Sequence, residues 1–196
     1  MGIKRGTLEV GSIFRGSVVI SKVYRGTTVI YELADGTFLE LIEDITVAGS
    51  AVTSVQFTGF TATKEDTLVL VSELLTDAGH GFQLMVNNNL TASNYYYQYL
   101  FGDGTGVSGS RGNFGYYIFG SSPSDFSIAN IKLTNDGYFT VQSDTTRASG
   151  SSLKLMDNYV SSTFTMSDIT QLDIVAGASL KIFVGSRFSL YKIVGV

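Results

Sequence analysis

The chain has 196 residues, a net charge of −4 and no cysteine, with 44% of its residues hydrophobic and 15% charged. Without cysteine it can form neither a disulfide framework nor a thiolate metal site. An aromatic content of 12% with so little charge excludes a disordered chain, and 22 glycines beside a single proline indicate short strands joined by turns.

The N-terminal region contains a short internal repeat. Residues 13–20 and 23–30 align at an offset of ten, each with an apolar residue, an aromatic residue, Arg-Gly and a hydroxyl residue before a β-branched run. The glycine of each copy predicts a turn between two strands. We expect residues 1–44 to form a small β-meander ending in a hairpin around Asp35-Gly36, and no secretory signal, since no apolar stretch follows the basic start.

From residue 45 onward, apolar and polar residues alternate in short runs that predict strands rather than helices. A polar turn is expected at Asn87-Asn88-Asn89, and a glycine-rich segment from Gly102 is expected to form a long flexible loop as far as Gly115. Asp136-Gly137, between two alternating runs, is a strong hairpin signal. The predicted strands include 67–71, 82–86, 95–101, 116–119, 126–133, 138–142, 153–156, 171–175, 179–184 and 187–194.

Strands at this regular spacing predict an all-β fold, an antiparallel β-sandwich in which two sheets each bury one face. A jelly roll is the leading architecture for residues 45–196, and another Greek-key topology remains the alternative. No apolar run approaches the roughly 18 residues that span a bilayer, and no basic patch is present. We therefore expect neither a membrane nor a nucleic-acid partner.

Residues suited to catalysis are few. His80 is the single histidine and is expected in a turn, and the acidic pairs Glu43-Asp44 and Glu65-Asp66 are sequence neighbours whose side chains would diverge on a strand. A glycan depolymerase would need two convergent carboxyl groups. We expect no enzyme activity, no cofactor and no metal site.

Tyrosines and nearby polar residues form the main candidate binding site. Tyr95, Tyr97 and Tyr99 share one face of a predicted strand, and Tyr96 lies on the other. One set is expected to fill the core, while the other would pack against a neighbouring subunit, contact a glycan or cover an unassigned surface. The candidate contact residues are Tyr95, Tyr97, Tyr99, Arg111, Asn113, Phe114 and Tyr116.

Three parts of the sequence resemble a family of phage virion proteins. They are an Asn-rich turn followed by an aromatic strand and a Gly-rich loop (84–104), a closing pattern Gly-Ser-x-apolar-x-Leu-Tyr-x-Ile (185–193), and an attachment-like segment (22–32). The resemblance implies a structural role in a virion assembled in the host cytoplasm, as a head fibre, a decoration protein, or a tail or baseplate component. It also implies a homo-oligomer, with a trimer as the expected state.

Two functions follow as hypotheses. In the first, residues 1–44 attach the protein to other virion proteins and residues 45–196 assemble through sandwich contacts between subunits. In the second, the protein is a carbohydrate-binding or receptor-binding module that recognises host surface glycans. The two hypotheses are compatible with each other.

Overall fold

The computed structural model describes residues 13–195 apart from 16–17, 21, 26–27, 33–36, 77–79, 103–105, 115, 121–124, 150–151 and 178–179. The chain separates into two compact units. The first comprises residues 1–38 with 194–196, and the second, called here the main unit, comprises residues 39–193. Strand β5 (Thr37–Thr46) runs across the boundary expected between residues 44 and 45.

The first unit contains two hairpins in its described residues. β1 (Ile13–Arg15) pairs with β2 (Val18–Ile20), and β3 (Lys22–Arg25) pairs with β4 (Thr28–Glu32), both antiparallel. Each copy of the internal repeat thus supplies a strand that ends in arginine and a β-branched strand paired with it. The expected turn glycines and the expected hairpin at Asp35-Gly36 lie outside the described residues.

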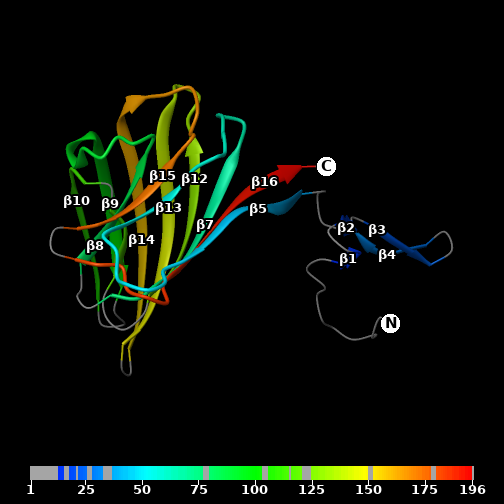
Figure 1. The fold of residues 1–196 in the computed structure, drawn as a ribbon, viewed down its shortest axis with the longest axis horizontal. Coiled ribbons are helices and arrows are strands. Elements are labelled where there is room, and N and C mark those ends of the chain that lie inside the picture. The colour runs from blue at the N-terminus through cyan, green and yellow to red at the C-terminus, as the bar shows by residue number, and fades with distance from the viewer. Residues whose placement is uncertain are drawn as a thin grey trace. The chain divides into compact units, whose positions relative to one another are not determined.

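The main unit is built from two sheets, and the larger one has eight strands (Figure 1). Its strands are β5, β7 (Thr67–Leu74), β9 (Tyr95–Gly102), β10 (Val107–Gly112), β12 (Asp125–Leu133), β13 (Tyr138–Ser149), β14 (Ser152–Thr165) and β16 (Arg187–Gly195). Their order across the sheet is β10-β9-β14-β13-β12-β7-β16-β5.

The smaller sheet has the order β11-β8-β15-β6. Its strands are β6 (Ser54–Phe57), β8 (His80–Val86), β11 (Tyr116–Gly120) and β15 (Leu172–Ala176). Helical structure among the described residues is limited to a 3-10 turn, η2, at Ala92–Asn94. No helix in this part of the chain has the length and apolar character needed to cross a membrane.

Eight of these strands follow the jelly-roll order. In chain order they are β5, β6, β7, β8, β11, β12, β15 and β16. One sheet contains the first, eighth, third and sixth of them side by side, and the other contains the second, seventh, fourth and fifth. The prediction of an all-β, jelly-roll-like sandwich is therefore confirmed.

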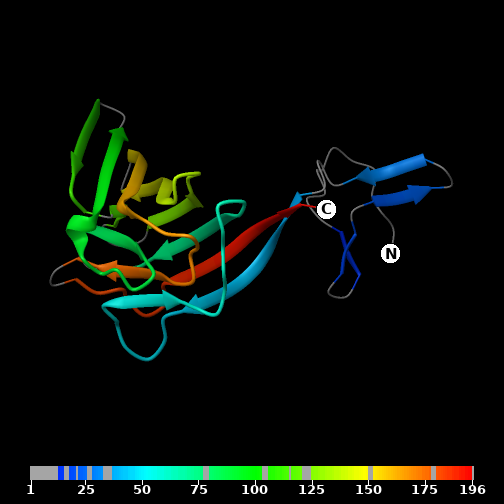
Figure 2. The ribbon, with the colours of Figure 1, turned by 90° about the horizontal axis from the view of Figure 1, so that it is seen from above.

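Four more strands extend the larger sheet beyond the jelly roll. β9 and β10 are inserted between β8 and β11, and β13 and β14 between β12 and β15. β13 pairs with β12, β14 pairs with β13, and β9 pairs with β14, so the two insertions meet side by side. The extended sheet curves, and β9 and β10 stand at an angle to β7 and β16 (Figure 2).

One hydrophobic core joins the two sheets. In β13, alternation directs every second side chain inward, so that Phe139 and Val141 are buried while Tyr138 and Gln142 are exposed. Strand β7 contributes Leu68, Leu70 and Leu74, which are fully buried. The largest fully buried side chains are Tyr95, Phe57, Phe82, Phe139 and Phe188.

The predicted turns at Asn87-Asn88-Asn89 and Asp136-Gly137 are present. Asn87 and Asn88 have φ angles of 52° and 57°, a region that asparagine tolerates better than most residues. Gly137 has φ of +84°, and its N–H donates to the carbonyl oxygen of Thr134 at 2.9 Å. Both segments therefore reverse the chain as their residue types predict.

Two predictions about strands are wrong. The segment expected to be a flexible loop contains β10, because Val107–Gly112 pairs with β9 along its whole length. The strand expected at 179–184 is reduced to an isolated bridge between Val52 and Ile182. The apolar residues Leu180 and Ile182 of this segment are buried, which explains the alternating sequence pattern, but the segment has no continuous strand partner.

Candidate binding groove

A row of polar side chains crosses the outer face of the larger sheet. The strand registers place Arg111 beside Gln98, Gln98 beside Tyr159, Tyr159 beside Gln142, and Gln142 beside Asn130. All five residues are exposed. Because directly paired residues of neighbouring strands point to the same face, these side chains form one line perpendicular to the strands.

A second row runs parallel to the first, two residues further along each strand. It places Tyr96 beside Ser161, Ser161 beside Thr140, and Thr140 beside Lys132. The Thr140 hydroxyl donates to the Lys132 carbonyl oxygen at 3.2 Å, a contact that links β13 to β12. The two rows together form the floor of a surface groove.

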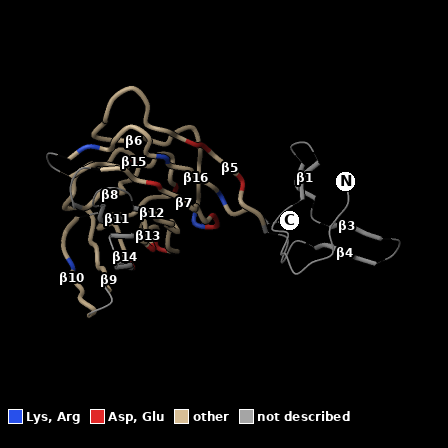
Figure 3. Tube along the Cα trace, turned by 90° about the horizontal axis from the view of Figure 1, so that it is seen from below, with Lys and Arg blue, Asp and Glu red and all other residues tan. Residues whose placement is uncertain are grey.

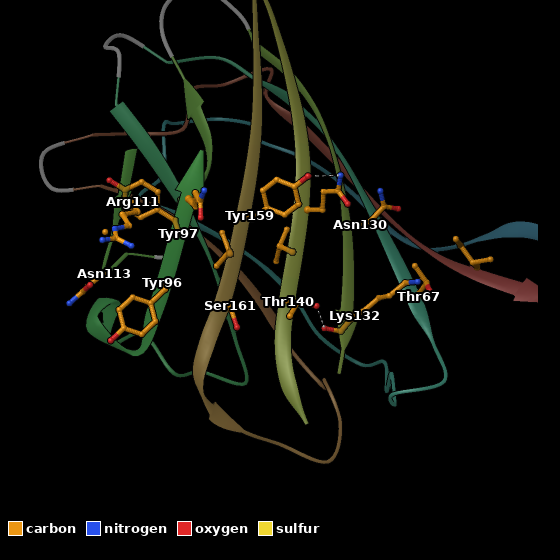
Figure 4. A pocket seen from close by; sticks show the side chains of 16 residues that line it. Thr67, Tyr96, Tyr97, Arg111, Asn113, Asn130, Lys132, Thr140, Tyr159 and Ser161 are labelled. Atoms are coloured by element: carbon orange, nitrogen blue, oxygen red, sulfur yellow. Dashed lines mark hydrogen bonds between the residues drawn. The ribbon is translucent and has the colours of Figure 1, made fainter. Parts of the chain in front are cut away.

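The groove has a volume of about 980 Å³ and lies over the curved part of the sheet (Figure 4). The view shows Arg111, Tyr96, Tyr159 and Lys132 projecting from four different strands toward the same open side. Its lining comprises Thr67, Tyr96, Tyr97, Gln98, Arg111, Gly112, Asn113, Asn130, Lys132, Thr140, Val141, Gln142, Tyr159, Val160, Ser161 and Ile193.

Two of the three tyrosines that line the groove have exposed rings. The exposed fractions are 54% for Tyr96 and 45% for Tyr159. The Tyr159 hydroxyl donates to Asp157 Oδ2 at 3.0 Å and accepts from Gln142 Nε2 at 3.3 Å. The hydrogen bond to Asp157 also raises the pKa of Tyr159 above its ordinary value. Both bonds hold the ring in place while leaving its exposed surface available to a ligand.

Tyr95 lies beneath the groove, in the core. It is fully buried and makes edge-on ring contacts with Phe139 and Phe164, at centroid distances of 6.2 and 5.8 Å. Its hydroxyl accepts from the Val86 N–H at 3.0 Å and donates to the Asn89 carbonyl oxygen at 2.8 Å. Burial raises the pKa of Tyr95 to about 12.

Tyr97 and Tyr99 follow Tyr95 on the same face of β9, as the sequence predicts. Both are half-buried, and their rings are stacked with centroids 6.0 Å apart and an interplanar angle of 4°. Tyr97 also contributes to the groove lining. A Cβ added at Gly112 would come within 2.8 Å of the Tyr97 ring, so the ring lies directly against the backbone of β10 at this position.

The other predicted contact residues separate into two groups. Arg111 and Asn113 line the groove. Phe114 is 43% exposed and is not among the lining residues. Tyr116 begins β11 in the smaller sheet, paired with Gln83, and its side chain lies outside the described part of the chain. Of the seven predicted residues, the described groove contains Tyr97, Arg111 and Asn113.

Several groove residues were not predicted. Tyr96 was assigned to the face opposite the candidate residues, and alternation alone could have marked it as the exposed tyrosine once the core face was known. Gln98, Tyr159, Gln142, Asn130 and Lys132 come together only through long-range strand registers. No local pattern in the sequence indicates that β9 pairs with β14.

The predicted acidic pairs have structural contacts away from the groove. Asp44 accepts from Arg187 Nε at 3.0 Å, from Arg187 Nη2 at 2.8 Å and from the Ser189 hydroxyl at 2.8 Å, which joins β5 to β16. Asp66 pairs with Lys192 at 2.8 Å. These contacts lower the pKa of Asp44, chiefly through the Arg187 hydrogen bond, and the pKa of Asp66 is also lowered, against the effect of burial.

The described residues that line the groove include neither a carboxylate nor an imidazole. Within the same part of the chain, no cluster of three or more His, Asp or Glu side chains is arranged to hold a metal ion. The groove thus offers amides, hydroxyls, the rings of Tyr96, Tyr97 and Tyr159, and two cationic groups. That set suits reversible binding of a polar ligand.

No protein-family model matches this sequence, and no curated protein matches it significantly. The chemistry of the groove is therefore the basis on which a function can be argued.

Proposed function

We propose that this protein is a non-enzymatic carbohydrate-binding module whose ligand lies in the groove of the larger sheet. The observation that carries the proposal is the pairing of exposed tyrosine rings with rows of amide and hydroxyl groups on one curved surface. A sugar ring has an apolar face and a rim of hydroxyl groups. Tyrosine rings match the first, and Gln98, Gln142 and Asn130 match the second by both donating and accepting hydrogen bonds.

The shape of the groove supports a chain-like ligand. The row from Arg111 to Asn130 crosses five adjacent strands, so its side chains follow one another at about 4.8 Å, the spacing of strands in a sheet. An oligosaccharide lying perpendicular to the strands would contact each of them in turn. Architecture gives weaker support by analogy, since jelly rolls occur among lectin domains as well as viral capsid proteins.

Binding to a glycan array, followed by titration of the best ligand, tests the proposal. We expect the wild-type protein to bind a defined set of glycans. Tyr159→Ala should weaken binding about tenfold, because loss of a ring contact worth about 1.4 kcal/mol changes a dissociation constant by that factor. Tyr96→Ala should have a similar effect.

Tyr138→Ala is the matched control, because Tyr138 is 38% exposed and lies on the same strand as Gln142 but outside the groove lining. Its affinity should equal that of the wild type. Equal affinity of all three tyrosine variants would show that the groove is not the binding site.

We further propose that the module belongs to a phage virion, where it forms a homo-oligomer attached through its N-terminal residues. The resemblance of three sequence segments to phage virion proteins supports this setting. Leu39 and Leu41 add an observation from the fold, since they are 52% and 53% exposed on β5, an edge strand of the larger sheet. Exposed apolar residues on an edge strand favour contact with another chain.

Light scattering on a sizing column tests the oligomeric part of this proposal. A stable trimer or another closed oligomer that Leu39→Lys converts to monomer would support it. A wild-type protein that stays monomeric at all accessible concentrations would contradict the homo-oligomer and leave the carbohydrate-binding proposal to stand by itself.

A further inference from the structure

The charge of the groove differs in sign from that of the whole chain. The protein has 17 acidic and 13 basic residues and a net charge of −4. The described groove lining contains Arg111 and Lys132 and no acidic residue. Elsewhere in the main unit, basic and acidic residues are interspersed along the strands (Figure 3). The groove is therefore a locally cationic site on the surface of an acidic protein.

The two cations lie at opposite ends of the groove floor. Arg111 is on β10 and Lys132 on β12, with β9, β14 and β13 between them. Four strand spacings of about 4.8 Å separate them by roughly 19 Å across the sheet, and less where the sheet curves. One compact ion would not contact both groups, whereas an extended chain with repeated negative charges would.

The distribution of acidic side chains favours one side of the groove for the negative groups of a ligand. Asp157 on β14 is paired with Asp144 on β13. The two aspartates lie on one side of the row that runs from Arg111 to Asn130. Tyr96 and Lys132 belong to the row on the other side. Negative groups of a ligand would be repelled by the two aspartates and attracted toward the Lys132 side. Asp66, which precedes the lining residue Thr67, is paired with Lys192 at 2.8 Å.

We propose that the groove binds an acidic polysaccharide, a sugar chain bearing carboxylate groups, laid across the strands from Arg111 to Lys132. This inference rests on the proposed carbohydrate-binding function and specifies its ligand class. The Arg111 guanidinium can hold a carboxylate through two parallel hydrogen bonds, and Lys132 supplies a point charge at the other end. Tyr96 and Tyr159 contact the apolar ring faces between the charged groups, and the amides bind the hydroxyls.

Matched pairs of acidic and neutral glycans test this ligand class. The panel contains polygalacturonate, hyaluronan and sialylated oligosaccharides, each beside its carboxyl-reduced or desialylated counterpart. We expect the wild-type protein to bind acidic members at least about tenfold more tightly than their neutral partners. Binding should weaken as salt rises from 0.05 to 0.5 M, because the two cations are exposed and screened by ions.

Charge-neutralising variants connect the preference to the groove. Arg111→Gln and Lys132→Gln should each weaken binding of the acidic member about threefold at low salt, with little effect on any neutral glycan. Lys181→Gln is the matched control, because it makes the same change in net charge at an exposed lysine outside the groove lining. Its affinity should stay at the wild-type value. Circular dichroism and thermal melting verify that each variant is folded.

The possible outcomes separate this inference from the proposal on which it rests. Equal binding of acidic and neutral partners, or equal losses in the Arg111, Lys132 and Lys181 variants, would overturn the acidic ligand class and leave carbohydrate binding intact. Binding to no glycan in the panel or on the full array would overturn both.

Discussion

The two faces of the larger sheet are built by the same strands but have opposite properties. On β9, Tyr95 is fully buried among aromatic rings, and the adjacent Tyr96 is 54% exposed in the groove. On β13, Phe139 faces the core, and Thr140 faces the groove. A change of one position along a strand therefore moves a residue from the buried set that stabilises the fold to the exposed set available for a ligand.

Substitutions at the two adjacent tyrosines should differ most in the free energy of unfolding. Tyr95→Ala should lower the free energy of unfolding by about 3–5 kcal/mol, because it leaves a large cavity and removes the hydroxyl that accepts from the Val86 N–H. Tyr96→Ala should change it by less than about 0.5 kcal/mol while weakening glycan binding. Urea unfolding measures the first quantity and titration the second.

Tyr95→Phe provides the more conservative test if the alanine variant does not fold. It keeps the ring and removes two hydrogen bonds, so a loss of about 1–3 kcal/mol is expected. Equal stability of the position-95 and position-96 variants would contradict the division of the sheet into a core face and a binding face.

A smaller effect is expected where β10 meets β9. Gly112→Ala would place a Cβ 2.8 Å from the Tyr97 ring, so the ring or the strand must move. We expect a loss of about 1–3 kcal/mol in unfolding free energy from overpacking. Glycan affinity should also fall, because Arg111 precedes Gly112 on the displaced strand.

Gly102→Ala is the control for that substitution, since a Cβ there meets nothing within 4 Å. Its unfolding free energy and glycan affinity should match those of the wild type. If Gly112→Ala were equally silent, the contact between Gly112 and Tyr97 would not determine the position of β10.

The smallest expected effect concerns pH and lies outside the groove. Asp44 and Asp66 have pKa values below their ordinary 3.8 in the folded protein. Their ion pairs therefore stabilise the fold fully above pH 3.8, and this contribution is lost as the pH falls through the lower folded-state values. Asp66→Asn should flatten the acid side of the stability curve, measured as thermal midpoints between pH 2 and 6. An unchanged acid dependence would show that the Lys192 pair contributes nothing measurable.

The fold class followed from the sequence because strand periodicity and turn chemistry are local signals. Alternation predicted β12 and β13, and Asp136-Gly137 predicted the turn between them. Strand β10 was missed because Gly109 and Gly112 are unfavourable in strands in general. Here Gly112 is needed, since the Tyr97 ring occupies the space that a side chain would take.

The groove was predictable only in part, for a different reason. Alternation correctly placed Tyr95 with Tyr97 and Tyr99 and separated Tyr96 from them. Which set faced the core depended on how β9 pairs with the rest of the sheet. Tyr159 and Gln142 enter the groove through the pairing of β9 with β14 and of β14 with β13. Pairing between such distant segments cannot be predicted from the periodicity of the sequence.

The pairing of the two insertions also has a consequence for folding. The groove floor requires β9 and β14, which come from separate parts of the chain and are joined from Ser162 beside Tyr95 to Leu155 beside Gly102. Contacts of such high sequence separation form slowly, after local hairpins such as β12–β13. The floor is thus complete only once both distant segments have come together. A ligand that occupies it would bind the native chain and not the unfolded one, and would raise the midpoint of unfolding with the logarithm of its concentration once that exceeds the dissociation constant.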